Sequence, residues 1–105
     1  MQLDKIFNEF KVDNAVVFGK DAIVIYQKGD IDEMLIVELT AFFKQIEQFE
    51  LISFSEVNIA FGDKAIIGKR LGEYYLAVIA DKEDFNERLP FYFFLMFNKV
   101  KRELL

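Results

Sequence analysis

The sequence predicts an α+β domain in which a five-stranded, mostly antiparallel sheet carries helices on both faces. Apolar residues with helical spacing occur near both ends and in the middle of the chain. The two stretches between them are rich in β-branched and aromatic residues and are broken by glycine-bearing turns. At 105 residues the chain has room for one core, so residues 1–105 are expected to form a single domain of order α-ββ-α-βββ-α.

The first helix and the first hairpin are expected within the N-terminal third. Helical i, i+3, i+4, i+7 spacing is shown by Leu3, Ile6, Phe7 and Phe10. The stretch NAVVFGKDAIVIYQKGD then predicts two strands that are joined at a tight turn, Gly19-Lys20-Asp21. The run AVVF is apolar throughout, which is typical of a central strand that is buried on both faces.

A long middle helix is expected after this hairpin, with Asp30 or Asp32 as its N-cap and its end near Phe49. One stripe about a third of the circumference wide is predicted to face the sheet. That stripe consists of Ile31, Leu35, Leu39, Phe42, Ile46 and Phe49. Ile36 and Phe43, which are seven residues apart, are then expected on a different side of the helix, beyond the stripe.

Three strands are predicted from SEVNIAF, KAIIGKRL and EYYLAVIAD, with turns at Gly62-Asp63 and Leu71-Gly72. The first has apolar residues alternating with polar ones, as expected for a strand with one wet face. YYLAVIA is nearly all apolar and predicts a second central strand. We therefore expect the middle helix on one face of the sheet and the two terminal helices on the other.

The last helix is expected from about Asp84 to Leu104, with Pro90 in or just before its first turn. Its core face is predicted to be Leu89, Phe93, Met96, Phe97, Val100 and Leu104. Phe91, Phe94 and Leu95 point away from that face. Burying an apolar side chain contributes about 1.5–3 kcal/mol, so these three residues, together with Ile36 and Phe43 of the middle helix, are expected to be covered. Either neighbouring loops and the first helix cover them, or a second subunit or partner does.

One stretch occurs twice: VVFGKDAIVI is followed 43 positions later by IAFGDKAIIG. Gly19 matches Gly62 in this repeat. A duplicated unit with two copies of a binding site is one interpretation. We favour the other, in which each copy forms the turn region of a separate hairpin.

Residues for catalysis are scarce in this chain. It contains neither histidine nor cysteine, which removes the commonest proton shuttle, metal ligand and thiolate nucleophile. Ser53 and Ser55 have no nearby base, and the glycine-bearing stretches lack the spacing of a phosphate-binding loop. Lys69 and Arg70 beside a turn are read as a solvated hairpin tip, with an anion site as the alternative. We predict no enzyme, no cofactor and no metal.

The net charge of −5 argues against a nucleic-acid partner, because such proteins present a basic surface. The N-terminal MQLDKIFNEF lacks the apolar core of a signal peptide, and no apolar run approaches the roughly 20 residues that span a bilayer. We expect a cytoplasmic protein without membrane insertion. Scarce Ser, Thr and Cys beside many Lys and Glu residues are also a compositional hint of a thermophile.

In order and length, the first hairpin, the helix EMLIVELTAFFKQI and the meander SEVNIAFGDKAIIGKRLGEYYLAVIAD resemble the roadblock (dynein light chain roadblock) family, in its prokaryotic form. The resemblance spans about residues 3–103. It implies a homodimer whose middle helices pack together and whose third strands pair edge to edge. The implied interface residues are Ile36, Phe43, Val57, Ile59 and Phe61.

The resemblance also implies a non-catalytic scaffold or regulator of a small Ras-like GTPase. The last helix is more aromatic than the family pattern, so Phe91, Phe94 and Leu95 are predicted to serve a further partner or a higher oligomer. The alternative from another class is a ligand-sensing domain. In that case the many phenylalanines, with Tyr26, Tyr74, Tyr75 and Tyr92, would enclose an apolar pocket.

Overall fold

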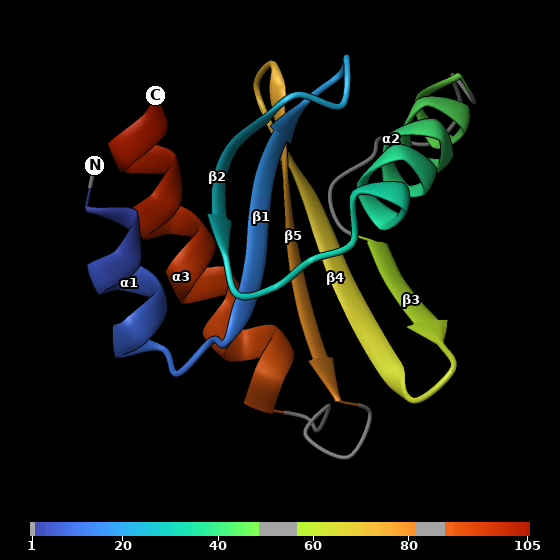
Figure 1. Cartoon of the computed structure of the whole chain (residues 1–105). Coiled ribbons are helices and arrows are strands. Elements are labelled where there is room, and N and C mark those ends of the chain that lie inside the picture. The colour runs from blue at the N-terminus through green and yellow to red at the C-terminus, as the bar shows by residue number, and fades with distance from the viewer. Residues whose placement is uncertain (1, 49–56, 82–87) are drawn as a thin grey trace.

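A computed structural model describes residues 2–48, 57–81 and 88–105. The elements follow the predicted order: α1 (Leu3–Glu9), β1 (Asn14–Gly19), β2 (Val24–Lys28), α2 (Glu33–Glu47), β3 (Val57–Phe61), β4 (Lys64–Leu71), β5 (Tyr74–Asp81) and α3 (Arg88–Leu104). The strands form one sheet in the order β2-β1-β5-β4-β3, and every pairing is antiparallel. α2 covers one face, and α1 and α3 cover the other (Figure 1). The predicted fold class and helix placement are confirmed.

The sheet separates two core layers, and each central strand contributes alternate residues to both. β1 places Ala15 and Val17 under α1 and α3, and places Val16 and Phe18 under α2. β5, its neighbour in the sheet, does the same with its own alternate residues. This two-sided burial explains why both strands are apolar along nearly their whole length.

The two copies of the repeated stretch lie in the β1–β2 and β3–β4 hairpins, as predicted, but their turns differ. Gly62 adopts a left-handed φ of 60° in the short connection from β3 to β4. In the first hairpin Ala22 takes the left-handed conformation instead, with φ 68°. There the Gly19 amide donates to the Ile23 carbonyl at 2.9 Å, and the Ala22 amide donates to the Gly19 carbonyl at 3.0 Å. Similar sequence therefore does not give similar turn geometry.

α2 is rotated about its axis relative to the prediction. Asp32 is the N-cap, because its side chain accepts from the Met34 amide at 2.9 Å. The helix buries Ile36, Leu39, Thr40 and Phe43. Phe42 is 39% exposed, and Leu35 and Ile46 are half-buried; Phe49 lies outside the described residues. The prediction that Ile36 and Phe43 lie beyond the core stripe is wrong.

The reason for this rotation lies in β4 and in Thr40. A Cβ atom at Gly68 would stand 2.4 Å from Cζ of Phe43, so the missing side chain makes the space in which the ring packs. Thr40 is tolerated on the buried face because its hydroxyl donates to the Ile36 carbonyl at 2.8 Å. The helix thus turns its aromatic ring toward the one position of β4 that can receive it.

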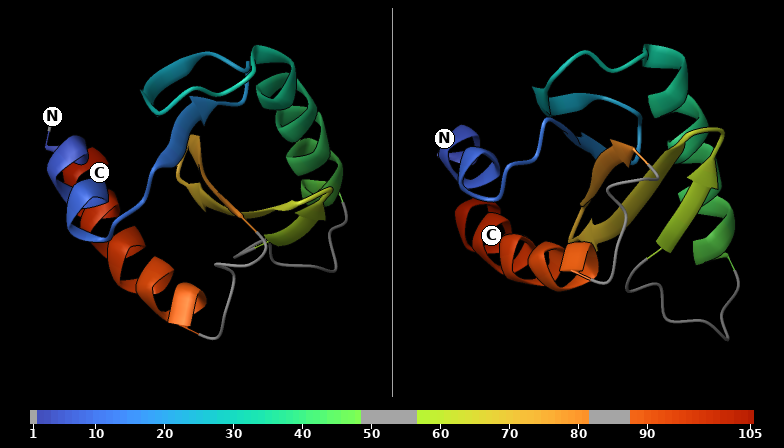
Figure 2. Two further views of the ribbon diagram at one scale, coloured as in Figure 1. Left: turned by 60° about the horizontal axis from the view of Figure 1, so that its bottom comes forward. Right: turned by 90° about the horizontal axis from the view of Figure 1, so that it is seen from below.

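α3 agrees with the prediction where its side chains are described, and the side chain of Leu89 lies outside that description. It buries Phe93, Met96, Phe97 and Val100, with Leu104 partly buried. Pro90 lies in the first turn, whereas the predicted start near Asp84 falls outside the described residues. α1 lies alongside α3 (Figure 2), and the Lys99 ammonium is 2.8 Å from the Glu9 carboxylate. Leu3, Ile6 and Phe7 of α1 are buried, as predicted.

Candidate interaction surfaces

Metal-ligating groups do not converge in the described chain. Residues 2–48, 57–81 and 88–105 hold no group of three or more acidic, histidine or cysteine side chains suited to a metal ion. Ser53 and Ser55 lie outside these ranges. Lys69 and Arg70 point to opposite faces of the sheet, as neighbours in a strand must. The two cations therefore do not form a joint anion site.

Three surface hollows bear on the alternative of an apolar ligand pocket. Their volumes are about 180, 250 and 280 Å³. Ligand pockets usually occupy roughly 300–1,000 Å³. All three hollows also include charged side chains: Lys64 lines the first two, and Lys20, Asp21 and Lys44 line the third. These hollows give the ligand-sensing alternative no support.

The first candidate surface combines the edge of the sheet at β3 with the nearby flank of α2. β4 is the one described neighbour of β3 in the sheet. Leu35 lies beside Ile66 of β4, and Phe42, seven residues later on the same helix flank, is 39% exposed. We call this set the β3-edge surface. It contains the predicted interface residue Ile59, which is half-buried against the core layer under α2. The side chains of Val57 and Phe61 are outside the description.

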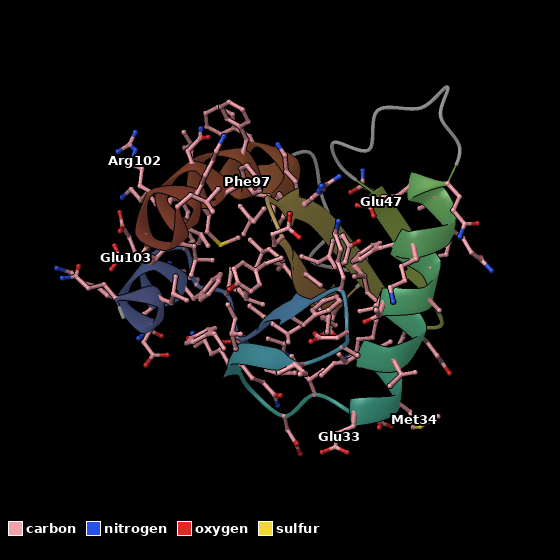
Figure 3. The ribbon with its side chains drawn as sticks, turned by 90° about the horizontal axis from the view of Figure 1, so that it is seen from above. Glu33, Met34, Glu47, Phe97, Arg102 and Glu103 are labelled. Atoms are coloured by element: carbon pink, nitrogen blue, oxygen red, sulfur yellow. The ribbon has the colours of Figure 1, made fainter. Side chains whose placement is uncertain are left out.

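The second candidate surface is the outer stripe of α2, formed by Met34, Val37 and Ala41. Met34 is 62% exposed and Val37 is 51% exposed. Figure 3 shows Glu33 and Met34 projecting away from the body of the molecule at the start of the helix. Val37 and Ala41 also line a hollow with residues 20–22 of the β1–β2 connection. Sequence reasoning missed this stripe, although its i, i+3, i+7 spacing was a readable signal.

The end of α2 is held to the sheet by polar contacts. The Tyr75 hydroxyl donates to Oε2 of Glu47 at 2.8 Å, and Oε1 of Glu47 is 3.5 Å from Nη1 of Arg70. Oε1 makes no hydrogen bond with suitable geometry among the described residues, so the Arg70 contact is an ion pair alone. Burial, followed by the hydrogen bond and the charge of Glu47, raises the pKa of Tyr75 well above its usual range. These contacts hold the C-terminal end of α2 against β4 and β5.

The third candidate surface is the outer face of α3. Phe91 is 63% exposed, Phe94 is 54% exposed and Leu95 is 39% exposed. The prediction that these side chains point away from the core is confirmed, and their role as a partner surface stays a prediction. The Lys69 ammonium lies 5.8 Å from the centre of the Phe94 ring and 4.1 Å from that of Phe97, whose position at α3 is marked in Figure 3. Alternation along β4 placed Lys69 on this face, a signal that the sequence analysis did not use.

No described helix is long and apolar enough to cross a membrane. The candidate surfaces described above are the β3-edge surface, the outer stripe of α2 and the outer face of α3. All three are suited to contact with other macromolecules, because they are apolar and solvent-exposed.

Comparison with known proteins identifies the fold. No family model matches the sequence, and no curated protein matches it. The structure is similar to Myxococcus xanthus MglB, with a TM-score of 0.77 and 13% identity over 93% of this chain and 87% of that one. It is also similar to a Roadblock/LC7 domain from Streptomyces avermitilis, with a TM-score of 0.71 and 16% identity over 89% and 85%.

A further similar structure is Acanthamoeba castellanii profilin II, with a TM-score of 0.68 and 10% identity over 99% of this chain and 97% of that one. The chain thus has the roadblock fold, as the sequence resemblance implied, and this architecture is shared with profilin. At these low sequence identities the structural similarity identifies the fold and not the function. The function is therefore inferred from the surfaces of the protein.

Proposed function

We propose that the protein is a non-catalytic homodimeric interaction module of the cytoplasm that regulates or scaffolds a small Ras-like GTPase. The observation that carries the proposal is the β3 edge, which adjoins an apolar flank of α2 on a roadblock fold. An open strand edge offers unpaired N–H and C=O groups to another chain. The roadblock resemblance supplies the expectation that a second copy pairs there and that a GTPase is the client.

The proposed dimer pairs two β3 strands edge to edge, so that the two sheets become continuous. Phe42 and Leu35 take the place of the earlier candidates Ile36 and Phe43, which are buried within one chain. Ile59 stays among the contacts because it lies in the edge strand itself. Pairing through this edge leaves Met34 and Val37 exposed, so the outer stripe of α2 is the surface proposed for the GTPase.

The dimer is tested by light scattering at micromolar concentration. A mass near twice 12.3 kDa is expected for the wild type, with a shift toward the monomer for Phe42→Glu. Val37→Glu is the matched control, because it puts the same charge on the other flank of the same helix and should leave the dimer intact. A monomeric wild type would exclude the dimer. Phe43→Glu is unsuitable, since it would place a charge in the core.

The GTPase role is tested with Ras-like GTPases encoded next to this protein. Phosphate release during GTP hydrolysis is measured with and without the module, together with binding in the GDP and GTP states. We expect either faster turnover or nucleotide-dependent binding, and we expect Val37→Glu to reduce it. If the wild type neither binds nor alters turnover, the GTPase role fails even where the dimer is found.

A further inference from the structure

α3 is a basic helix in an acidic protein. Its sequence carries four basic residues, Arg88, Lys99, Lys101 and Arg102, and one acidic residue, Glu103, whereas the whole chain has a net charge of −5. Lys99 is paired with Glu9 on the side of α3 that faces α1. Lys101 is exposed and lies seven residues after Phe94, so both occupy the opposite flank, which faces β4.

Lys69 of β4 adds a cation to this same flank. Its ammonium is held over the Phe94 and Phe97 rings and makes no ion pair with any described residue. Lys64, on the same strand, is by contrast paired with Asp81. A lysine that contacts two aromatic rings and no carboxylate can still form an ion pair with an acidic group of a partner.

No described helix covers this face of the sheet at β3, beside the α3 flank. The core layer under α1 and α3 draws its strand residues from β1, β5 and β4. In β3 the described side chains on this face are Asn58 and Ala60, and both are exposed. Figure 2 shows α1 and α3 together toward the β1 side, with β3 at the far edge. A step therefore runs along α3, with the helix flank as its wall and the β3–β4 face as its floor.

We propose that this step, lined by Phe91, Phe94, Lys101, Lys69 and Ala60, docks an acidic amphipathic helix of a partner protein. A helix laid beside α3 would bury apolar residues against Phe94 and Ala60 and would continue the layer that α1 and α3 begin. Carboxylates on one side of that helix would pair with Lys69 and Lys101. The charge of the step selects for acidic residues, and the aromatic rings supply apolar area.

A protein helix fits this step better than an anionic membrane does. The molecule measures 34 × 31 × 26 Å, and a flat membrane would face much of one side of it. The net charge of −5 opposes such an approach. A single helix beside α3 meets mainly the charges within about 8–10 Å of it, the screening length in physiological salt, and Lys69 lies on the flank against which that helix would pack. Lys69 is half-buried beside the Phe94 and Phe97 rings, where a flat surface reaches it poorly.

This surface lies on the opposite face of the sheet from α2 (Figure 1). Its occupant would therefore not compete with a second copy at β3 or with a GTPase on the outer stripe of α2. The inference goes beyond the proposed function and does not depend on it, because it follows from α3 and the neighbouring face of β3 and β4.

The test uses a synthetic amphipathic peptide about five helical turns long, with leucines at i, i+3, i+4 and i+7 flanked by glutamates. A matched peptide carries lysine at every glutamate position. Binding to the full chain is measured by fluorescence anisotropy. We expect the glutamate peptide to bind, the lysine peptide to bind at least about tenfold more weakly, and binding to weaken as salt rises.

Two variants locate the site: Lys69→Glu and Phe94→Ser should each weaken the glutamate peptide about tenfold or more. Met34→Ser, an exposed apolar residue on α2, is the control and should leave binding unchanged. Circular dichroism of each variant confirms that it is folded. Equal binding of both peptides, or binding unaffected by Lys69→Glu and Phe94→Ser, would overturn the proposal. The proposal would also be overturned if the protein sedimented with phosphatidylserine vesicles and bound neither peptide.

Discussion

The two faces of the sheet are covered by different means. On one face α1 and α3 lie side by side and bury a largely aliphatic layer with Phe7, Phe93 and Phe97. On the other face α2 is the one described helix over the strands, and several aromatic rings fill the core layer beneath it. The ring of Phe43 lies 6.0 Å from that of Phe18 and 5.0 Å from that of Tyr75, centre to centre. One face thus depends on area shared by two helices, and the other depends on the fit of a few rings.

This difference teaches when helical periodicity identifies the buried side. In α3 the side opposite the core becomes polar at Asn98 and Arg102. The core-facing stripe is therefore the one apolar stripe that continues along the whole length of the helix. In α2 apolar residues surround most of the circumference, and two stripes compete. The stripe that is buried is the one that contains Phe43, because the Phe43 ring fits over Gly68.

The largest expected effect breaks the aromatic layer under α2. Phe43→Ala should lower the free energy of unfolding by about 3–5 kcal/mol, because a fully buried ring is replaced by a cavity. Phe42→Ala, the adjacent and partly exposed ring, should cost no more than about 1 kcal/mol in the monomer. Urea denaturation at low protein concentration measures both. A larger loss for Phe42→Ala would mean that α2 is rotated as the periodicity first predicted.

The next effect tests the position on β4 that receives the ring. Gly68→Ala places a methyl group where Cζ of Phe43 stands 2.4 Å away, so the ring must shift and unfolding should become easier by about 1–3 kcal/mol. Adding Phe43→Leu removes the clash. The double variant should therefore lose less than the sum of the two single losses, as measured by a double-mutant cycle. Strict additivity would show that the residues do not contact each other.

A pH titration compares the two faces through one tyrosine on each. Burial and a carboxylate partner raise the pKa of Tyr75, which bonds Glu47, and that of Tyr26, which bonds Asp4. Unfolded tyrosine releases its proton near pH 10, while the folded chain retains these protons. Stability from both groups is therefore complete below about pH 10 and is lost as pH rises above it.

Chemical denaturation at about pH 8 and about pH 11 measures this loss, spanning the usual tyrosine pKa. The fall in stability between these conditions should be smaller in Tyr75→Phe, and smaller in Tyr26→Phe, than in the wild type. A fall of the same size in all three proteins would contradict the assignment of both tyrosines.

The smallest expected effect sharpens the contrast within α3. Phe94→Ala should change the free energy of unfolding by no more than about 0.5 kcal/mol, because a surface side chain away from packed features contributes little. Its neighbour Phe93 is 2% exposed, and Phe93→Ala should cost about 3–5 kcal/mol. Thermal and urea unfolding of the pair check this contrast. A large loss in the free energy of unfolding for Phe94→Ala would indicate that this ring stabilises the fold, which would argue against a role in contacting a partner.

The sequence by itself determined the order of the elements, the two-layered α+β class, the central position of β1 and β5, and the buried face of α3. These features depend on local information: hydrophobic period, turn residues and a capping carboxylate such as Asp32. It also indicated that Phe91, Phe94 and Leu95 lie outside the core. Each of these is settled within a few turns or strands of contiguous chain.

Only the tertiary structure decided the rotation of α2, the left-handed residue of the first turn and the place of Lys69 over the α3 rings. In each case residues distant in sequence compete for the same space. Phe43 is buried because Gly68, 25 positions later, leaves room for it. The β3-edge surface therefore contains Phe42 and not Phe43. The ring of Phe43 is buried against the sheet, although periodicity alone placed it outside the core.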